Sequence, residues 1–238
     1  MKYTVLIVTA LLAGLVQGIT GLGSGIVQML TYTLYWPLAT AAAVSVCVSV
    51  PLNLSMLLIH RKDIRWKKVL FPVFPYMLIG SAAISATGLI NQTLMKKLFG
   101  AFLIALAIYY LFFNRREKKQ LSVLQSVVCI LASSLCAAFF GIGGPLMTVY
   151  FLNKTDSMSE YLGTVSAFFL INNLYSTVYR FLNGILSAEH LPYIGAGCLA
   201  VLAGVYAACL IAKRINDNTL KKSVYIMIGL TGILNLFN

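Results

Sequence analysis

Charged residues are scarce in this sequence: they make up 10% of its 238 residues, whereas soluble domains usually carry about 25%. Acidic residues are the scarcest, with six Asp and Glu against 18 Lys and Arg. Hydrophobic residues reach 60%, and the mean hydropathy is +0.87. Because a membrane helix needs about 20 apolar residues, most of the chain must lie in a bilayer. The composition excludes an ordinary soluble domain and predicts one all-α, polytopic membrane domain over residues 1–238.

Motifs for enzyme chemistry and metal binding are also missing. The sequence contains no GxSxG, no HExxH and no P-loop. The five cysteines lie in apolar stretches without CxxC spacing, which is typical of buried packing. They are Cys47, Cys129, Cys136, Cys198 and Cys209. We therefore expect no enzyme, no metal and no cofactor.

The formal charge of +12 does not indicate nucleic-acid binding, because no basic stripe is interleaved with aromatic residues. In a membrane protein, Lys and Arg mark cytoplasmic loops and contact lipid head groups. Carboxylates are missing from the middle of the apolar segments, which weakens a proton relay or a cation site. The polar groups left at depth are neutral and suit a small anion. The expected partners are the lipid bilayer and a small anionic substrate; a homo-oligomer stays open.

Glycines interrupt the first apolar segment at residues 18–26, "GITGLGSGI". Each glycine costs a helix interior about 1 kcal/mol relative to alanine, and loose backbone is costlier still in a membrane. The pattern predicts a break in the first helix, covered by protein or facing a water-filled cavity. The N–H groups that start the next half-helix would favour an anion. The alternative is close helix packing through small residues.

The chain repeats itself with a shift of 120 residues. "LVQGITGLGSGI" (15–26) then aligns with "LCAAFFGIGGPL" (135–146). The same shift aligns Asn53 with Asn173, His60 with Arg180 and Pro72 with Pro192. A shift of 125 aligns residues 90–97 with residues 215–222. Such duplication is typical of transporters, and it predicts a first repeat over 1–113 and a second over 122–238.

Two topologies fit about eight membrane segments in two repeats. In one, the segments beside each glycine break form a single crossing and the repeats are parallel. In the other, each broken pair is a re-entrant hairpin and the repeats are inverted. The second topology, with the N-terminus outside, gathers more Lys and Arg on one side, which the positive-inside rule slightly favours.

The candidate binding residues combine the glycine breaks with neutral polar side chains. The expected substrate-binding residues are Gly21, Gly23, Ser24, Gly25, Ser45, Asn53, Gly141, Gly143, Gly144, Thr164 and Asn173. The asparagines could instead bond between helices, a contact worth about 0.6 kcal/mol. His60 and Arg180 end their segments, so they either form an anion-attracting vestibule or extend their polar ends to the interface.

Together, "GITGLGSGI", "GIGGPLMTVYFL" (141–152) and the Gly-Thr-Val-Ser of residues 163–166 resemble the sulfite exporter TauE/SafE family, also called the toluenesulfonate uptake permease family. The first half departs from the pattern: Ala43–Val46 lacks the Gly-Thr, and the first break lacks Gly-Gly-Pro. The resemblance spans nearly the whole chain. It implies a duplicated fold and transport of small anions, such as sulfite, thiosulfate, organosulfonates and some carboxylates.

The expected function is a secondary transporter that works by alternating access around a midplane site between the two breaks. The resemblance places it in the bacterial cytoplasmic (inner) membrane as a multi-pass protein. The alternatives are a passive anion channel, a transporter of short carboxylates, and a membrane-embedded enzyme or assembly partner without transport.

Overall fold

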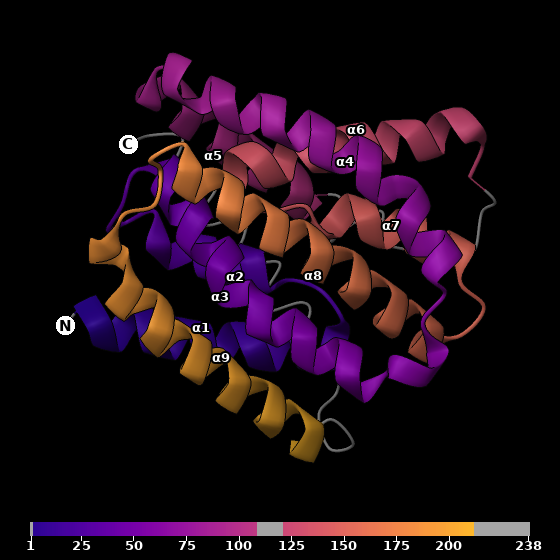
Figure 1. Cartoon of the computed structure of the whole chain (residues 1–238). Coiled ribbons are helices and arrows are strands. Elements are labelled where there is room, and N and C mark those ends of the chain that lie inside the picture. The colour runs from indigo at the N-terminus through magenta and orange to yellow at the C-terminus, as the bar shows by residue number, and fades with distance from the viewer. Residues whose placement is uncertain (1, 109–120, 212–238) are drawn as a thin grey trace.

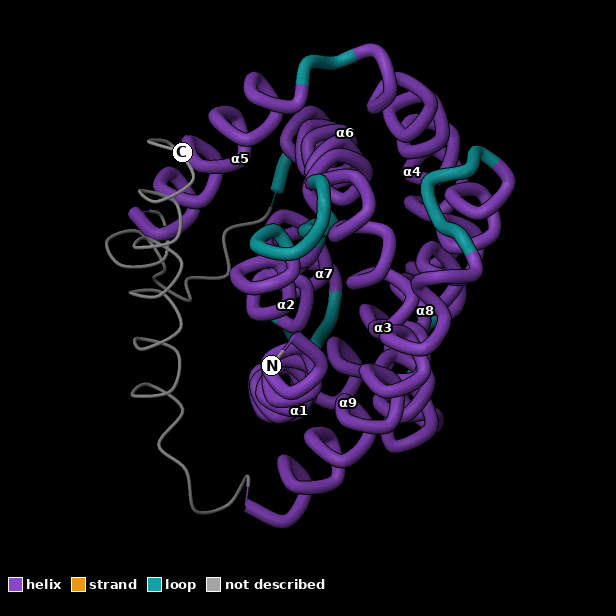
Figure 2. The backbone as a smooth tube through the Cα atoms, turned by 90° about the vertical axis from the view of Figure 1, so that its left-hand side faces the viewer, coloured by secondary structure: helices purple, strands orange, loops and turns teal. Residues whose placement is uncertain are grey.

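The computed structural model describes residues 2–108 and 121–211, and within these ranges it contains helices and no strands (Figures 1 and 2). The α-helices are α1 (Lys2–Thr20), α2 (Ser24–Tyr32), α3 (Leu38–Ile59), α4 (Trp66–Ala86), α5 (Gln92–Ile108), α6 (Val123–Phe140), α7 (Gly144–Lys154), α8 (Met158–Leu182) and α9 (Leu191–Ile211). The all-α prediction is confirmed for the described residues. The end of the expected second repeat, residues 212–238, and the end of the expected first repeat, residues 109–113, lie outside them.

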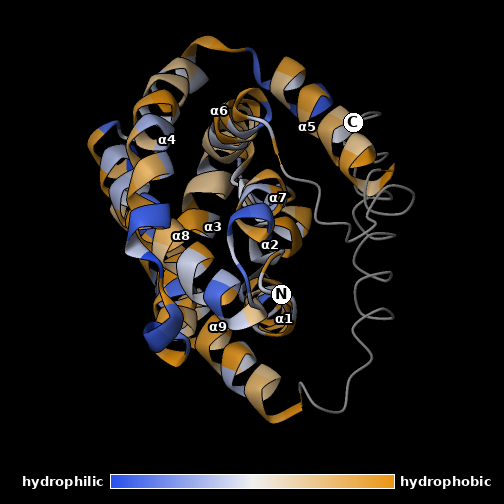
Figure 3. Ribbon diagram, turned by 90° about the vertical axis from the view of Figure 1, so that its right-hand side faces the viewer, coloured by the Kyte–Doolittle hydropathy of each residue, from blue (hydrophilic) through white to orange (hydrophobic). Residues whose placement is uncertain are grey.

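Five of the described helices are long and apolar enough to cross a membrane, namely α1, α3, α4, α6 and α9. The outward face of α4 is strongly apolar: Leu70, Phe71, Phe74 and Leu78 are all more than 60% exposed. In Figure 3 the hydrophobic colour covers much of the helix surfaces, and the hydrophilic colour gathers mainly at their ends. These features fit a polytopic membrane protein whose apolar side chains face lipid.

Helices α1 and α2 form an antiparallel hairpin. The chain turns at Gly21 and Gly23, whose φ values of 77° and 106° lie in the left-handed region that glycine adopts without steric cost. Across the hairpin, the Thr31 hydroxyl donates to Thr9 Oγ1 at 3.0 Å. The nine-residue α2 therefore returns toward the end of the molecule where α1 begins.

The turn at Gly21 and Gly23 is the first of two interruptions between helices. The second interruption separates α6 from α7 and lies 120 residues later in the sequence. Helix α6 ends at Gly141, which has a φ of 66° and caps the helix through its N–H. Helix α7 begins at Gly144 with Pro145 in its first turn, where the missing N–H of proline costs nothing. The Ser133 hydroxyl of α6 donates to the Gly143 carbonyl at 2.6 Å and fixes the turn.

The long helices form two further pairs, α3 with α8 and α1 with α9. Arg180 of α8 bonds to Ala39 at the start of α3, and Ser159 at the start of α8 meets His60 at the end of α3. Helices α3 and α8 are therefore antiparallel. Tyr3 stacks on Tyr193, which makes α1 and α9 parallel. A Cβ atom on Gly14, Gly18 or Gly204 would overlap the facing helix, so small residues permit this close packing.

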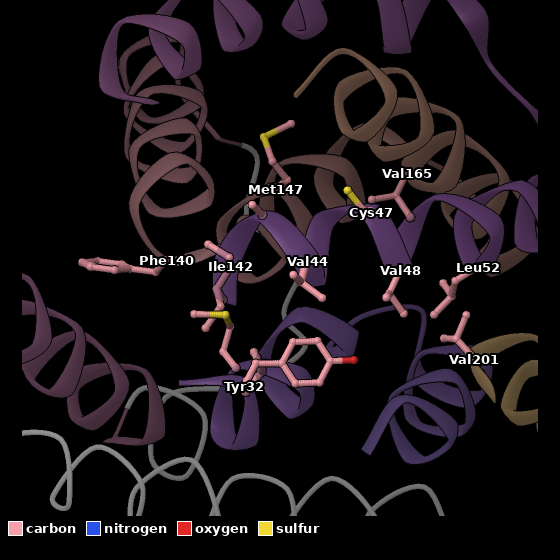
Figure 4. Packing of buried hydrophobic residues seen from close by; sticks show 14 of the residues in the cluster. Tyr32, Val44, Cys47, Val48, Leu52, Phe140, Ile142, Met147, Val165 and Val201 are labelled. Carbon is pink, nitrogen blue, oxygen red and sulfur yellow. The ribbon is translucent and has the colours of Figure 1, made fainter. Parts of the chain in front are cut away.

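This pairing defines two ends of the molecule. At the Trp36 end, on the left in Figure 1, lie the starts of α1, α3 and α9 and the end of α8. At the Asp63 end lie the end of α3 and the starts of α4 and α8, joined by ion pairs of Glu160 with Lys68 at 2.7 Å and with Arg65 at 3.5 Å. Between the ends, Val44, Val48 and Leu52 of α3 pack with Ile142 and other residues in the core (Figure 4).

Candidate functional site

A cavity lies between the two interruptions and is lined by residues of both halves of the chain. The empty space in and in front of this cavity, open solvent included, is about 780 Å³. The α1–α2 turn contributes Gln17, Gly21, Gly23, Ser24 and Gly25; α3 and α4 contribute Ser49, Asn53, Tyr76 and Ser81; the α6–α7 turn contributes Ser134, Gly141, Gly143 and Gly144; α8 contributes Asn172, Asn173 and Ser176. All of these residues are uncharged.

The two interruptions touch each other at glycines. A Cβ atom on Gly25 would lie only 2.6 Å from the carbonyl oxygen of Gly141. A Cβ atom on Gly141 would lie 3.1 Å from Cα of Ala42. Both glycines are therefore required for backbone packing. Gly144 differs, because a Cβ atom there would meet nothing within 4 Å and would project into open space.

A buried amide network holds the start of α2. Gln17 Oε1 accepts bonds from the hydroxyl and the backbone N–H of Ser24, the latter at 3.3 Å. Gln17 Nε2 donates to Asn53 Oδ1 at 3.1 Å, and Asn53 Nδ2 donates to the Ser49 carbonyl at 2.8 Å. The amide of Asn53 thus bonds between helices and also lines the cavity, so the two interpretations of this residue coexist.

Tyr76 holds the second interruption from the other half of the chain. Its hydroxyl donates to the Ser133 carbonyl at 3.1 Å, and a Cβ atom on Gly143 would overlap it. Ser134 donates to the Tyr76 carbonyl at 2.7 Å. Tyr76 is not predictable from the sequence, because a single tyrosine in an apolar helix gives no signal of its partner. Gln17 is also absent from the expected binding residues, although its side chain bonds to both Asn53 and Ser24.

The cavity offers hydrogen-bond donors to a negatively charged solute. Helices α2 and α7 both begin at its wall, and the N–H groups of a first helical turn have no carbonyl partner within their own helix. The aligned peptide dipoles also place about half a positive charge at each helix start. Amide and hydroxyl side chains add further donors. This chemistry suits a small anion.

The structure brings most of the expected binding residues together. Those that line the cavity are Gly21, Gly23, Ser24, Gly25, Asn53, Gly141, Gly143, Gly144 and Asn173. Two lie elsewhere. Ser45 is one helical turn from the lining residue Ser49, and its buried hydroxyl forms no hydrogen bond. Thr164 lies toward the Asp63 end, where its hydroxyl accepts the backbone N–H of Arg65 at 3.2 Å.

The expected vestibule of His60 and Arg180 is not formed, because these side chains lie at opposite ends of α3. His60 contacts Ser159 at 3.1 Å at the Asp63 end. Partial burial lowers the pKa of its imidazole, although the nearby Asp63 carboxylate acts in the opposite direction. Arg180 lies toward the Trp36 end and is fully buried, so its side chain does not extend to the interface.

Among residues 2–108 and 121–211, no group of three His, Cys, Asp or Glu side chains is placed to hold a metal ion. All five cysteines are free. Cys47 is buried as expected, whereas Cys209 is exposed on α9.

The family model described as "Sulfite exporter TauE/SafE" matches residues 6–234, which is nearly the whole chain. No curated protein and no solved structure matches the sequence.

Proposed function

Because this chain belongs to the sulfite exporter TauE/SafE family, we propose that it is a secondary transporter of small anions, with sulfur oxyanions or organosulfonates as substrates. Members of this family are membrane transporters, which supports a transport function over an enzymatic one. The observation that carries the proposal is the uncharged, donor-rich cavity between two interrupted helices. Backbone N–H groups at the starts of α2 and α7 would hold the anion's oxygen atoms, and the side-chain amides of Asn53 and Asn173 would add hydrogen bonds.

The architecture that we propose is a pair of inverted repeats, over residues 1–113 and 122–238. Supporting it, α1–α2 and α6–α7 are interrupted at positions 120 residues apart, and α3 runs antiparallel to its counterpart α8. Such repeats place the substrate site where they meet, and one repeat rocks against the other to alternate access.

The proposed orientation puts the Asp63 end in the cytoplasm of a bacterial cell and the N-terminus outside. Arg61, Lys62, Arg65, Lys67 and Lys68 gather at the Asp63 end. Retention of short basic loops on the cytoplasmic side supports this choice.

Tracer flux into proteoliposomes tests the function. The anions are sulfite, thiosulfate, a short sulfonate and a short carboxylate, each with and without a pH or sodium gradient, and protein-free liposomes are the control. We expect the uptake of a sulfur anion to be saturable. Unlabelled anion loaded into the liposomes beforehand should accelerate this uptake by exchange. Non-saturable flux would favour a passive channel, uptake of the carboxylate alone would favour that substrate class, and no flux from folded protein would contradict the proposal.

A further inference from the structure

Arg180 is buried, and every hydrogen-bond acceptor that it reaches among the described residues is neutral. It is the largest fully buried side chain of the described residues. Its guanidinium donates to Ser176 Oγ at 3.3 Å and to the Ala39 carbonyl at 3.4 Å. Two more bonds reach the last turn of α6, at the Ala137 carbonyl (3.3 Å) and the Ala138 carbonyl (2.5 Å). All of these acceptors are neutral.

Within residues 2–108 and 121–211, the charge of Arg180 is only partly balanced. Among the described residues, the ion pairs of Asp and Glu involve Arg65, Lys68 and His190, and none includes Arg180. The end of α6 supplies the partial negative charge of a helix C-terminus, about half an elementary charge. A buried charge without a full partner is costly. A negatively charged solute beside Arg180 would supply the missing charge.

Arg180 also lies between two hollows of the molecule. At the Trp36 end, a surface hollow of about 950 Å³, including the open space at its mouth, lies among the start of α3, the end of α4 and the end of α8. Ala39 lines this hollow, whereas Ser176 lines the central cavity. Ile84 lines both. The guanidinium is therefore hydrogen-bonded to the wall of each hollow.

We propose that Arg180 is the charge-selecting residue of the transport path and that its guanidinium holds the anion as it passes between the surface hollow and the central cavity. The planar N–H groups of guanidinium match the oxygen atoms of sulfonates, sulfur oxyanions and carboxylates. Arg180 also offsets the carbonyls at the end of α6, which would otherwise repel an anion. The inference rests on the proposed function, because it assigns charge selection on the same path.

The test compares Arg180→Gln, Arg180→Lys and Arg180→His in proteoliposomes with thiosulfate, a dianion, and methanesulfonate, a monoanion. Glutamine can still donate to the α6 carbonyls but has no charge, whereas lysine keeps the charge. We expect Arg180→Gln to raise the KM for thiosulfate roughly 10- to 100-fold and to reduce the preference for the dianion. Arg180→Lys should keep a KM and a dianion preference close to those of the wild type. Lys97→Gln, which removes an exposed charge from α5, is the matched control and should behave as the wild type.

Histidine at this position provides a second readout, because it gains charge as the pH falls. As the pH is lowered, the KM of Arg180→His should decrease more steeply than the KM of the wild type. If Arg180→Gln keeps the wild-type KM and dianion preference, or if the KM of Arg180→His follows pH as the wild type does, Arg180 only caps α6 and the inference is wrong.

Thermal stability in detergent separates this inference from the proposed function. Thiosulfate should stabilise the wild type against unfolding more than an equal ionic strength of sodium chloride does, and it should not stabilise Arg180→Gln in this way. Stabilisation that depends on Arg180, without flux in the wild type, would support the anion site and contradict transport. Flux without any dependence on Arg180 would overturn the inference alone. A wild type that neither transports nor is stabilised would overturn both.

Discussion

Gly143 and Gly144 are neighbours at the second interruption, yet they have different surroundings. A Cβ atom on Gly143 would overlap the Tyr76 hydroxyl, whereas one on Gly144 would meet nothing within 4 Å. We expect Gly143→Ala to destabilise the protein by about 1–3 kcal/mol, since overpacking forces neighbours apart. Gly144→Val should fold normally but reduce flux, because its side chain occupies the cavity. Thermal unfolding and tracer flux measure the two effects.

Gly144→Ala is the control for that pair, because its single methyl group should reduce flux less than valine does. Wild-type flux in a folded Gly144→Val variant would show that the anion does not use this part of the cavity.

The Gln17–Asn53 bond is the second prediction at this scale. Gln17→Leu leaves the Asn53 carbonyl oxygen and the N–H of Ser24 without their partner, and each buried, unsatisfied group costs about 1–3 kcal/mol. We expect a lower unfolding temperature and reduced flux. In a double-mutant cycle, Gln17→Leu with Asn53→Leu should cost less than the two single changes added together. Additive costs would mean that the bond contributes nothing.

Single residues were predictable from the sequence where a local pattern marked them. The glycine clusters and Asn53 recur after 120 residues, and the structure places them in one cavity. Arg180 was located correctly at the end of a segment, but its burial depends on carbonyls of α3 and α6 that are 40 or more positions away. No local pattern encodes such a contact, and the same holds for Tyr76.

At the scale of elements, the α1–α2 hairpin can be tested by a disulfide. Thr9 and Thr31 face each other with their hydroxyl oxygens 3.0 Å apart, so the sulfur atoms of cysteines at the same positions can approach each other. In a background free of the five native cysteines, the variant Thr9→Cys with Thr31→Cys should form a cross-link on mild oxidation. Cleavage of the chain between the two sites, followed by electrophoresis, would then show a shift in mobility. Thr9→Cys with Thr33→Cys is the matched control.

Absence of that cross-link would favour the alternative in which α1 and α2 continue in one direction.

The sequence left this choice open for a physical reason. Glycines mark where a helix ends, because they adopt backbone angles that other residues avoid, but they do not fix the direction in which the chain leaves. Long-range contacts such as Thr9 with Thr31 decide that direction.

At the scale of the whole molecule, the orientation predicts which loops can be reached from outside the cell. Asn183 is exposed at the Trp36 end, and Lys62 is exposed at the Asp63 end. In the cysteine-free background, an impermeant maleimide on intact cells should label Asn183→Cys and should label Lys62→Cys only after the membrane is opened. The reverse pattern would invert the orientation while leaving the fold unchanged.

Alternating access makes a further demand on the molecule, because the two ends must open in turn. In the described structure the Asp63 end is bridged by side chains from both halves: Ser159 of α8 donates to Asp63 at 2.6 Å, and Glu160 pairs with Lys68. Asp63→Cys with Ser159→Cys should form a disulfide that holds this end shut. We expect oxidation to stop exchange and a reductant to restore it, because a carrier trapped with one end closed cannot complete its cycle. Each single-cysteine variant should be insensitive to oxidation. Exchange that continues in the fully cross-linked protein would mean that the halves do not separate at this end, and a passive channel would then explain the flux better than a rocking carrier.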